Sequence, residues 1–192
     1  MGVSLDEARA KLATHFAGDG AAQGQKWDAL WRDGGFLPWD RGLPSPALED
    51  LLSERHDLIS SALANGQTGN KRRKKALVPG CGRGYDVLLL SSFGYDSYGL
   101  EVSESAVKQC LEEREQHGMN YKVKDEATGS GKTDFVAGDF FQDTWLGRMN
   151  TQRFDLIYDY TVGVFLLWKE EGLFVQLATS SFVRYHQSCG PK

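Results

Sequence analysis

Glycines at alternate positions, Gly80, Gly82 and Gly84, follow a short apolar run and precede a helix-like segment. Glycine is needed where the backbone takes a positive φ or a ligand lies against the peptide, and a strand-to-helix junction points unpaired N–H groups at a ligand. Glu101 ends a second strand-like run about 20 positions later, where a carboxylate typically binds ribose hydroxyls. These residues predict a nucleotide-cofactor turn, with an ordinary glycine-rich turn as the alternative.

The spacing of the glycines distinguishes between two candidate cofactors. A dinucleotide fingerprint, Gly-x-Gly-x-x-Gly, would place glycine at position 85, where the chain has Tyr85. The pattern Gly-x-Gly-x-Gly instead resembles class I methyltransferases that use S-adenosyl-L-methionine, a cofactor with an amino acid tail and no pyrophosphate. The resemblance implies S-adenosyl-L-methionine as the cofactor, with NAD as the less favoured alternative.

Composition and charge limit the function classes. A chain of 192 residues with 41% hydrophobic residues is long enough for one globular domain with a real core. The net charge of −4 argues against nucleic-acid or anionic-membrane partners, because phosphate contacts need a basic face. The basic run 71–75 is interpreted as a solvated approach to a buried strand. Without a membrane-length apolar run or a secretory signal, we expect a cytoplasmic protein.

The cysteines and histidines do not predict a metal site. Three cysteines (Cys81, Cys110 and Cys189) are too few and too scattered for a disulfide framework or a zinc site. The four histidines show no metal-ligand spacing either. Cys81 lies inside the glycine turn, and we interpret it as a small filler rather than a nucleophile because no histidine is close in sequence.

Strand-like and helix-like segments alternate along the chain. Apolar strands separated by helices, with successive crossovers in one direction, predict an α/β fold with a doubly wound, mostly parallel sheet. We expect a single domain whose residues 1–70 form helices and a tryptophan-rich lid, 71–161 the cofactor-binding sheet and 162–192 a divergent tail. The predicted helices are 4–16, 45 to about 65, 85–93 and 103–118, the strands are 76–79, 97–101, 134–137 and 153–158, and 120–133 is a flexible surface insertion.

Three tryptophans, Trp27, Trp31 and Trp39, lie within thirteen positions. Tryptophans four apart on one helical face can simply cover a core. A second interpretation is that they enclose a sulfonium cofactor, since a cation over an indole face gains about 0.5–2 kcal/mol. Both interpretations stay open at this point.

Five motifs in order make the resemblance specific. Trp-x-x-x-Trp, Pro-Trp-Asp-x-Gly, Val-Pro-Gly-Cys-Gly-x-Gly-Tyr-Asp, Gly-Asp-Phe-Phe and Phe-Asp-Leu-Ile-Tyr-Asp-Tyr-Thr span residues 27–161. Together they resemble the thiopurine S-methyltransferase family, and within it the thiol and halide methyltransferases. This resemblance implies cofactor contacts: Trp27, Trp31 and Trp39 around the pocket, Gly80 and Gly82 under the methionine moiety, Glu101 on the ribose, Asp139 and Phe140 at the adenine, and Tyr160 by the reacting sulfur.

The implied reaction is methylation of a small thiol, or of a halide, and we expect the chain to be a monomer if it is fully folded. Displacement at a sulfonium already has a good leaving group, so alignment and exclusion of water supply most of the catalysis. A few per cent of a thiol with a pKa near 8.5 is thiolate at neutral pH, so no catalytic base is expected. Asp40, Arg41 and Tyr160 are candidate helpers in the pocket.

The motifs end at Thr161. The segment 162–192 does not continue them and is interpreted as a translated intron or a divergent ending, so that the sheet would be incomplete at its C-terminal end. Four strands would leave the last one as an apolar edge without a neighbour. The alternative function is therefore an inactive truncated relative that at most binds the cofactor.

Overall fold

The computed structural model describes residues 4–18, 23–65, 70–149, 151 and 153–160. The predicted tail 162–192 lies outside these residues. No helix in the described ranges combines the length and the apolar character needed to cross a membrane. In chain order the elements are α1 (Leu5–Phe16), α2 (Gln23–Asp33), α3 (Pro46–Glu54), β1 (Leu63–Asn65), β2 (Lys71–Arg73), β3 (Lys75–Pro79), α4 (Tyr85–Ser92), β4 (Asp96–Glu101), α5 (Glu104–His117), η2 (Gly118–Asn120), β5 (Thr133–Ala137), η3 (Asp143–Arg148) and β6 (Leu156–Ile157).

Four described strands form one parallel sheet in the order β5-β4-β3-β6. At its centre Leu77 of β3 is in register with Tyr98 of β4 on one side and Ile157 of β6 on the other. The predicted α/β, doubly wound parallel sheet is confirmed. The expectation that all crossovers run in one direction is wrong, because the chain moves from β3 to β5 and then returns to the far side of β3. This reversal puts a topological switch point between β3 and β6, and ligands of such sheets bind at the carboxyl ends there.

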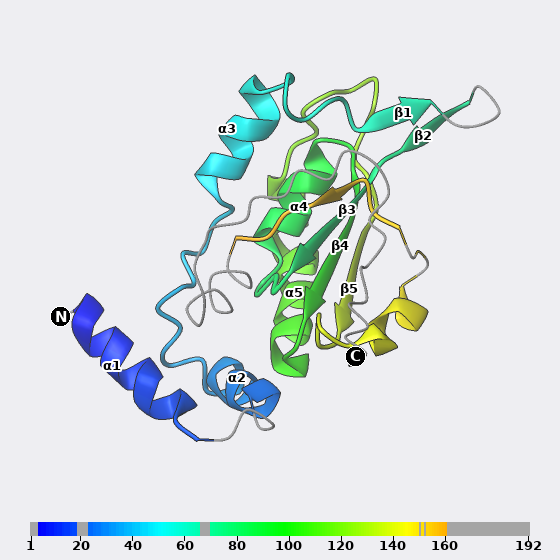
Figure 1. Cartoon of the computed structure of the whole chain (residues 1–192). Coiled ribbons are helices and arrows are strands. Elements are labelled where there is room, and N and C mark those ends of the chain that lie inside the picture. The colour runs from blue at the N-terminus through cyan, green and yellow to red at the C-terminus, as the bar shows by residue number, and fades with distance from the viewer. Residues whose placement is uncertain (1–3, 19–22, 66–69, 150, 152, 161–192) are drawn as a thin grey trace, which may run out of the picture.

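Alternate residues of β3 pack into different clusters of buried side chains. Ala76 and Val78 belong to a cluster with α4, α5 and α3, whereas Leu77 packs with Trp145 of η3 and the nearby Met149. In Figure 1 the sheet lies between the paired helices α4 and α5 and the η3 segment. Because β3 is buried on both faces, its sequence is a continuous apolar run and not an alternating one.

Helices α1 and α3 begin at the predicted residues. Ser4 accepts a hydrogen bond from the backbone N–H of Glu7, whose carboxylate accepts one from the N–H of Ser4, so α1 has a complete capping box. Pro46 stands at the first turn of α3. The prediction that this helix continues to about residue 65 is wrong, since α3 ends at Glu54.

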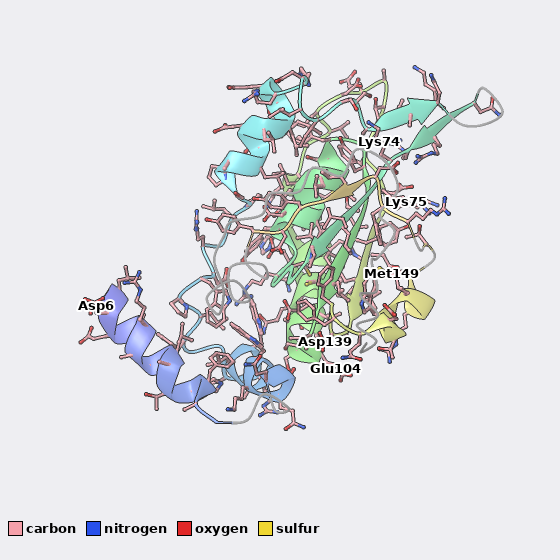
Figure 2. The ribbon with its side chains drawn as sticks, viewed as in Figure 1. Asp6, Lys74, Lys75, Glu104, Asp139 and Met149 are labelled. Carbon is pink, nitrogen blue, oxygen red and sulfur yellow. The ribbon has the colours of Figure 1, made fainter. Side chains whose placement is uncertain are left out.

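The residues after α3 form a hairpin with the basic run instead. Strand β1 pairs antiparallel with β2, and Leu63 is in register with Arg73. The backbone N–H of Lys74 also donates to the carbonyl of Ala62 at 2.7 Å. The basic run 71–75 is therefore part of two strands, and its interpretation as only a solvated approach is incomplete. Lys74 and Lys75 lie at the hairpin end of the sheet, far from Asp139 at the other end (Figure 2).

The polar segment 120–133, predicted as a flexible surface insertion, is fastened to the sheet in its C-terminal half. The Arg73 guanidinium donates to the carbonyls of Gly94, Thr128 and Gly129. The N–H of Gly131 donates to the carbonyl of Ser91 at 2.9 Å, and the Ser91 hydroxyl donates to the carbonyl of Gly131 at 2.8 Å. These bonds place the segment against the turn that leads into β4.

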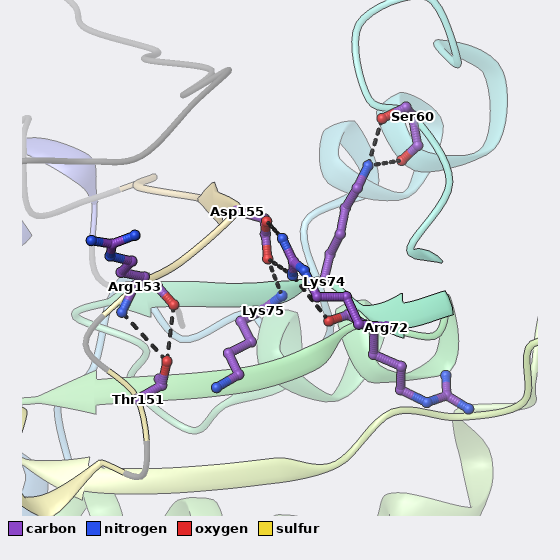
Figure 3. A network of polar contacts seen from close by, with 8 residues as sticks. Ser60, Arg72, Lys74, Lys75, Thr151, Arg153 and Asp155 are labelled. Carbon is purple, nitrogen blue, oxygen red and sulfur yellow. Dashed lines mark hydrogen bonds and ion pairs between the residues drawn. The ribbon is translucent and has the colours of Figure 1, made fainter. Parts of the chain in front are cut away.

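A charged network joins the start of β6 to the hairpin (Figure 3). Both carboxylate oxygens of Asp155 accept hydrogen bonds from the Arg72 guanidinium, at 2.6 and 2.8 Å. Asp155 Oδ2 also accepts from the backbone N–H of Lys75 at 2.9 Å. The bonds to Arg72, more than the other contacts, lower the pKa of Asp155 below its ordinary value.

Replacing Asp155 by asparagine is expected to destabilise the protein by about 1 kcal/mol at pH 7, because solvent around the half-exposed Arg72 screens the pair. A lowered folded-state pKa gives stability that is present above the unfolded-state value of 3.8 and is lost as the pH falls through the folded-state value. The stabilities of the wild type and of D155N should therefore become equal in acid. Thermal unfolding at pH 7 and at a pH below the lowered folded-state pKa of Asp155 measures this. The matched control, Asp57→Asn, breaks the fully exposed Arg55–Asp57 pair and should change little.

Candidate functional site

The glycine loop follows β3 and has the backbone that its sequence predicts. Gly80, Gly82 and Gly84 have φ values of 58°, 55° and 82°. A Cβ atom at Gly84 would lie 2.6 Å from the Phe135 ring, and one at Gly82 would lie 3.3 Å from the Trp31 ring. The loop therefore requires glycine both for its left-handed backbone and for its close packing.

The tryptophans of the N-terminal segment pack together beside this loop. The ring centroids of Trp27 and Trp39 are 5.2 Å apart and those of Trp31 and Trp39 are 6.1 Å apart, both in edge-to-face arrangements. Trp31 is only 4% exposed. Two of these rings, Trp31 and Trp39, also border the cavity described below.

Polar contacts to α5 hold α2 in this position. Asp28 Oδ1 accepts hydrogen bonds from the Ser103 hydroxyl at 2.8 Å and from the N–H of Ser105 at 2.9 Å. The Gln109 amide donates to the carbonyl of Trp31 at 2.9 Å. The bond from Ser105 is the main reason that the pKa of Asp28 is lowered. Helix α2 consequently packs at the N-terminal end of α5, at the opposite end of the sheet from the β1–β2 hairpin (Figure 1).

A cavity of about 300 Å³ lies between the glycine loop and the tryptophans. Its size is at the lower end for small-molecule sites. It is located at the switch point, because its walls include the end of β3 and the residue Tyr160 that follows β6. Of the nine residues predicted to bind the cofactor, five line it: Trp31, Trp39, Gly80, Gly82 and Tyr160.

Charged and polar side chains at the cavity form two hydrogen-bonded groups. Asp40 accepts from Arg83 Nε at 2.5 Å and from the Tyr85 hydroxyl at 3.1 Å. Burial, assisted by the charge of Asp40, raises the pKa of Tyr85. Asp86 accepts from the backbone N–H of Ser45 at 2.7 Å, and burial raises its pKa.

Sequence reasoning did not assign a role to Arg83, Tyr85 or Asp86, although all three line the cavity. The available signal was their position: they stand inside the glycine motif or directly after it. Side chains at the start of a helix that follows such a turn lie beside the ligand region.

Glu101 lies beneath the glycine loop and does not line the cavity. The residue is only 6% exposed. One carboxylate oxygen accepts from the N–H of Gly82 at 3.1 Å and the other accepts from the N–H of Ser103 at 3.2 Å. Burial raises its pKa, and these backbone bonds partly oppose that shift. In this geometry Glu101 fixes the backbone of the loop.

Three other predicted residues also lie outside the cavity lining. Asp139 accepts from the N–H of Phe141 at 2.9 Å and so shapes the turn after β5. Phe140 stacks on Trp145 with ring centroids 6.4 Å apart and packs into the cluster on the η3 face of the sheet. Trp27 packs between Phe16 and Trp39, behind the lining rings.

Two cysteines meet beneath the loop. The Cys81 and Cys110 sulfurs are 3.9 Å apart, and the Cys110 thiol donates to the carbonyl of Gly82 at 2.7 Å. The hydrogen bond to Cys110 and burial raise the pKa of the Cys81 thiol well above its ordinary value. This environment supports the interpretation of Cys81 as a packing residue, because a protonated thiol is a poor nucleophile. The described residues contain no cluster of side chains able to hold a metal ion.

The chain is similar to known methyltransferases. The family model for thiopurine S-methyltransferase matches residues 22–169, so the resemblance does not end at Thr161 as predicted. Thiocyanate methyltransferase 1 of Brassica oleracea is 38% identical over 136 residues, which are 71% of this chain and 47% of that protein. Probable thiol methyltransferase 2 of Arabidopsis thaliana is 31% identical over 150 residues, 75% of this chain and 53% of that protein.

The chain thus spans about half the length of the curated relatives it matches. A solved structure described as "Conversion of a Disulfide Bond into a Thioacetal Group during Echinomycin Biosynthesis" aligns with a TM-score of 0.50 and 26% identity. That alignment covers 73% of this chain and 47% of the solved one. On the match of residues 22–169, the chain belongs to the thiopurine S-methyltransferase family.

Proposed function

We propose that this protein transfers the methyl group of S-adenosyl-L-methionine to a small thiol, with a halide ion as a further candidate acceptor. The observation that carries the proposal is the cavity at the switch point, where the glycine loop and the tryptophan-rich segment meet. These two motifs lie about 40 residues apart in the chain, and a class I methyltransferase fold binds its ligand at this edge of the sheet. The names of the relatives, thiocyanate and thiol methyltransferases, support a small sulfur acceptor.

The residues around the cavity suit this cofactor. In the proposal Gly80 and Gly82 contact the methionine moiety, Trp31 and Trp39 enclose the sulfonium, and Tyr160 lies by the reacting sulfur. Trp27 supports these rings from behind. The family resemblance assigns Glu101 to the ribose and Asp139 with Phe140 to the adenine, and those three contacts remain predictions. The bound cofactor would supply a methyl group on a positively charged sulfur that is a good leaving group.

The chain's own residues would orient the acceptor and exclude water. The acceptor thiol loses its proton to water, and its sulfur supplies the electron pair of the new S–CH₃ bond. The electron pair of the broken bond stays on the sulfur of S-adenosylhomocysteine, so charge and atoms balance. Indole faces attract a sulfonium electrostatically, and the buried position of Trp31 keeps solvent from that side. No side chain needs to act as a base, because thiolate is already present at neutral pH.

An inactive relative that only binds the cofactor is the second candidate. The observation in its favour is that the chain spans about half the length of its curated relatives. The monomeric state, the cytoplasmic location and the lack of nucleic-acid or membrane partners remain predictions from the sequence.

Titration with S-adenosylhomocysteine is expected to change the intrinsic tryptophan fluorescence, because Trp31 and Trp39 border the proposed site. The change should shrink in Trp39→Phe and persist in Trp145→Phe, a matched change on the η3 face of the sheet. NAD should give no comparable signal. Methyl transfer from labelled S-adenosyl-L-methionine to 2-mercaptoethanol then separates the two candidates. Binding without transfer would favour the inactive relative, and a spectrum indifferent to saturating ligand would contradict the cofactor assignment.

A further inference from the structure

We propose that Arg41 forms an anion subsite in the cavity, which selects a small acceptor carrying a carboxylate in addition to its thiol. The inference rests on the proposed function, since it assigns the acceptor class of that same cavity. It starts from the position of Arg41, which belongs to the cavity wall and to the loop that links Trp39 to α3.

The guanidinium of Arg41 faces a neutral group. Its Nη2 donates to the Tyr160 hydroxyl at 2.5 Å, and its central carbon is 5.6 Å from the centroid of the Tyr160 ring. Among the described residues, no carboxylate lies within ion-pair distance of Arg41. A guanidinium carries five N–H donors, and the bond to Tyr160 uses one of them. Donors therefore remain for a ligand.

The other charges of the cavity have protein partners. Arg83 is paired with Asp40 at 2.5 Å, and Asp86 is held by the N–H of Ser45. The positive charge of Arg41 is close enough to Asp86 to oppose part of the effect of burial on its pKa. Arg41 thus differs from Arg83, whose charge is neutralised by direct contact. This contrast identifies Arg41 as the arginine of the cavity that is available to an anion.

The chemistry of methyl transfer decides which anion Arg41 would hold. A guanidinium paired with the reacting thiolate would stabilise the ground state and weaken the nucleophile, which does not accelerate the step. A carboxylate elsewhere on the acceptor avoids this conflict, and its two oxygens match the planar fork of an arginine. The whole cavity, which would also hold part of the cofactor, measures about 300 Å³, so such an acceptor must be a small molecule. A short mercaptocarboxylate has a thiol that is free to react, a separate carboxylate for Arg41 and a small volume.

The test compares 3-mercaptopropionate with 2-mercaptoethanol as acceptors for the full chain. Arg41→Gln should lower kcat/KM for the acid by about tenfold or more, mainly through KM, and by a clearly smaller factor for the neutral thiol, because only the lost bond to Tyr160 affects both acceptors. Arg41→Lys should recover part of the loss, because a point charge replaces the fork. Arg55→Gln, which removes the same charge from an exposed site, should leave both acceptors unchanged. Equal effects of Arg41→Gln on both thiols, or no effect on either, would overturn the subsite.

A binding measurement keeps the inference independent of turnover. With S-adenosylhomocysteine present, calorimetry should show that the wild type binds 3-mercaptopropionate more tightly than the isosteric 3-mercaptopropionamide, and that Arg41→Gln abolishes this preference. A wild type that does not prefer the acid contradicts the subsite even if it methylates thiols. Conversely, a preference that depends on Arg41 without any methyl transfer supports the subsite and contradicts the proposed activity.

Discussion

Replacing Gly131 by alanine adds a single methyl group, and it is expected to destabilise the protein by about 3 kcal/mol or more. A Cβ atom at this position would lie 1.8 Å from the carbonyl oxygen and 2.3 Å from the carbonyl carbon of Tyr95. Both are backbone atoms of the residue directly before β4, so no rotation of a side chain can relieve the contact. Relief would require moving the segment away from the sheet and breaking its hydrogen bonds with Ser91.

Gly147→Ala is the matched control, because a Cβ atom there has no other atom within 4 Å. Chemical denaturation of both variants measures the free energy of unfolding. We expect Gly147→Ala to change it by less than about 0.5 kcal/mol. If Gly131→Ala is as stable as the wild type, the close packing of this segment on β4 is wrong, and the flexible insertion predicted from the sequence is the better description.

Local signals predicted the central part of the fold well. The apolar run before Gly80 and the glycines after it predicted β3 and a loop with positive φ values, because both features are encoded within a few neighbouring residues. Ser4 predicted the capping box of α1 for the same reason. Parallel strands buried on both faces also have a direct compositional signature.

Features that depend on contacts between distant segments were predicted poorly. The helix expected to continue to about residue 65 ends at Glu54, because the following residues pair with the basic strand β2. The direction of the last crossover was also wrong, since nothing within β6 specifies on which side of β3 it lies. Both outcomes are set by tertiary packing, which overrides local propensity.

The site shows the same limit. Spacing from the first glycine located Glu101 near the loop but did not show that its carboxylate binds the N–H groups of Gly82 and Ser103. The contact between Arg41 and Tyr160 joins residues 119 positions apart. Sequence motifs can therefore identify the segments that meet at the cavity, whereas the structure is needed to show which side-chain atoms face it.

Glu101→Gln is expected to weaken S-adenosylhomocysteine binding by about 30-fold or more, the largest effect on the proposed cofactor site. Each oxygen of the carboxylate accepts from one backbone N–H, at Gly82 and Ser103. An amide offers only one oxygen, so one of these donors would face the amide NH₂ group. The loop under the proposed ligand then loses a charge-assisted hydrogen bond, and a ribose would lose its negatively charged acceptor.

Glu104→Gln provides the matched control. It removes the same charge from an exposed position on the first turn of α5, at the same end of the sheet as Asp139 (Figure 2). The affinity of this variant for S-adenosylhomocysteine should stay within about twofold of the wild-type affinity, because salt screens the charge of a solvent-exposed side chain. A large loss of affinity in this control would show that the effect of Glu101→Gln comes from the overall charge at this end of the sheet.

A second ligand separates the two roles of Glu101. A carboxylate has about four lone-pair sites, so Glu101 could accept from ribose hydroxyls while it holds the loop. If it does, the wild type should bind S-adenosylhomocysteine more tightly than the 2′,3′-dideoxy analogue, and Glu101→Gln should remove most of that difference. Calorimetric titration of both ligands into both proteins gives the coupling energy between the Glu101 carboxylate and the ribose hydroxyls. Equal weakening of the two ligands would contradict the ribose contact and leave Glu101 as the residue that shapes the loop, while unchanged affinities would contradict both roles.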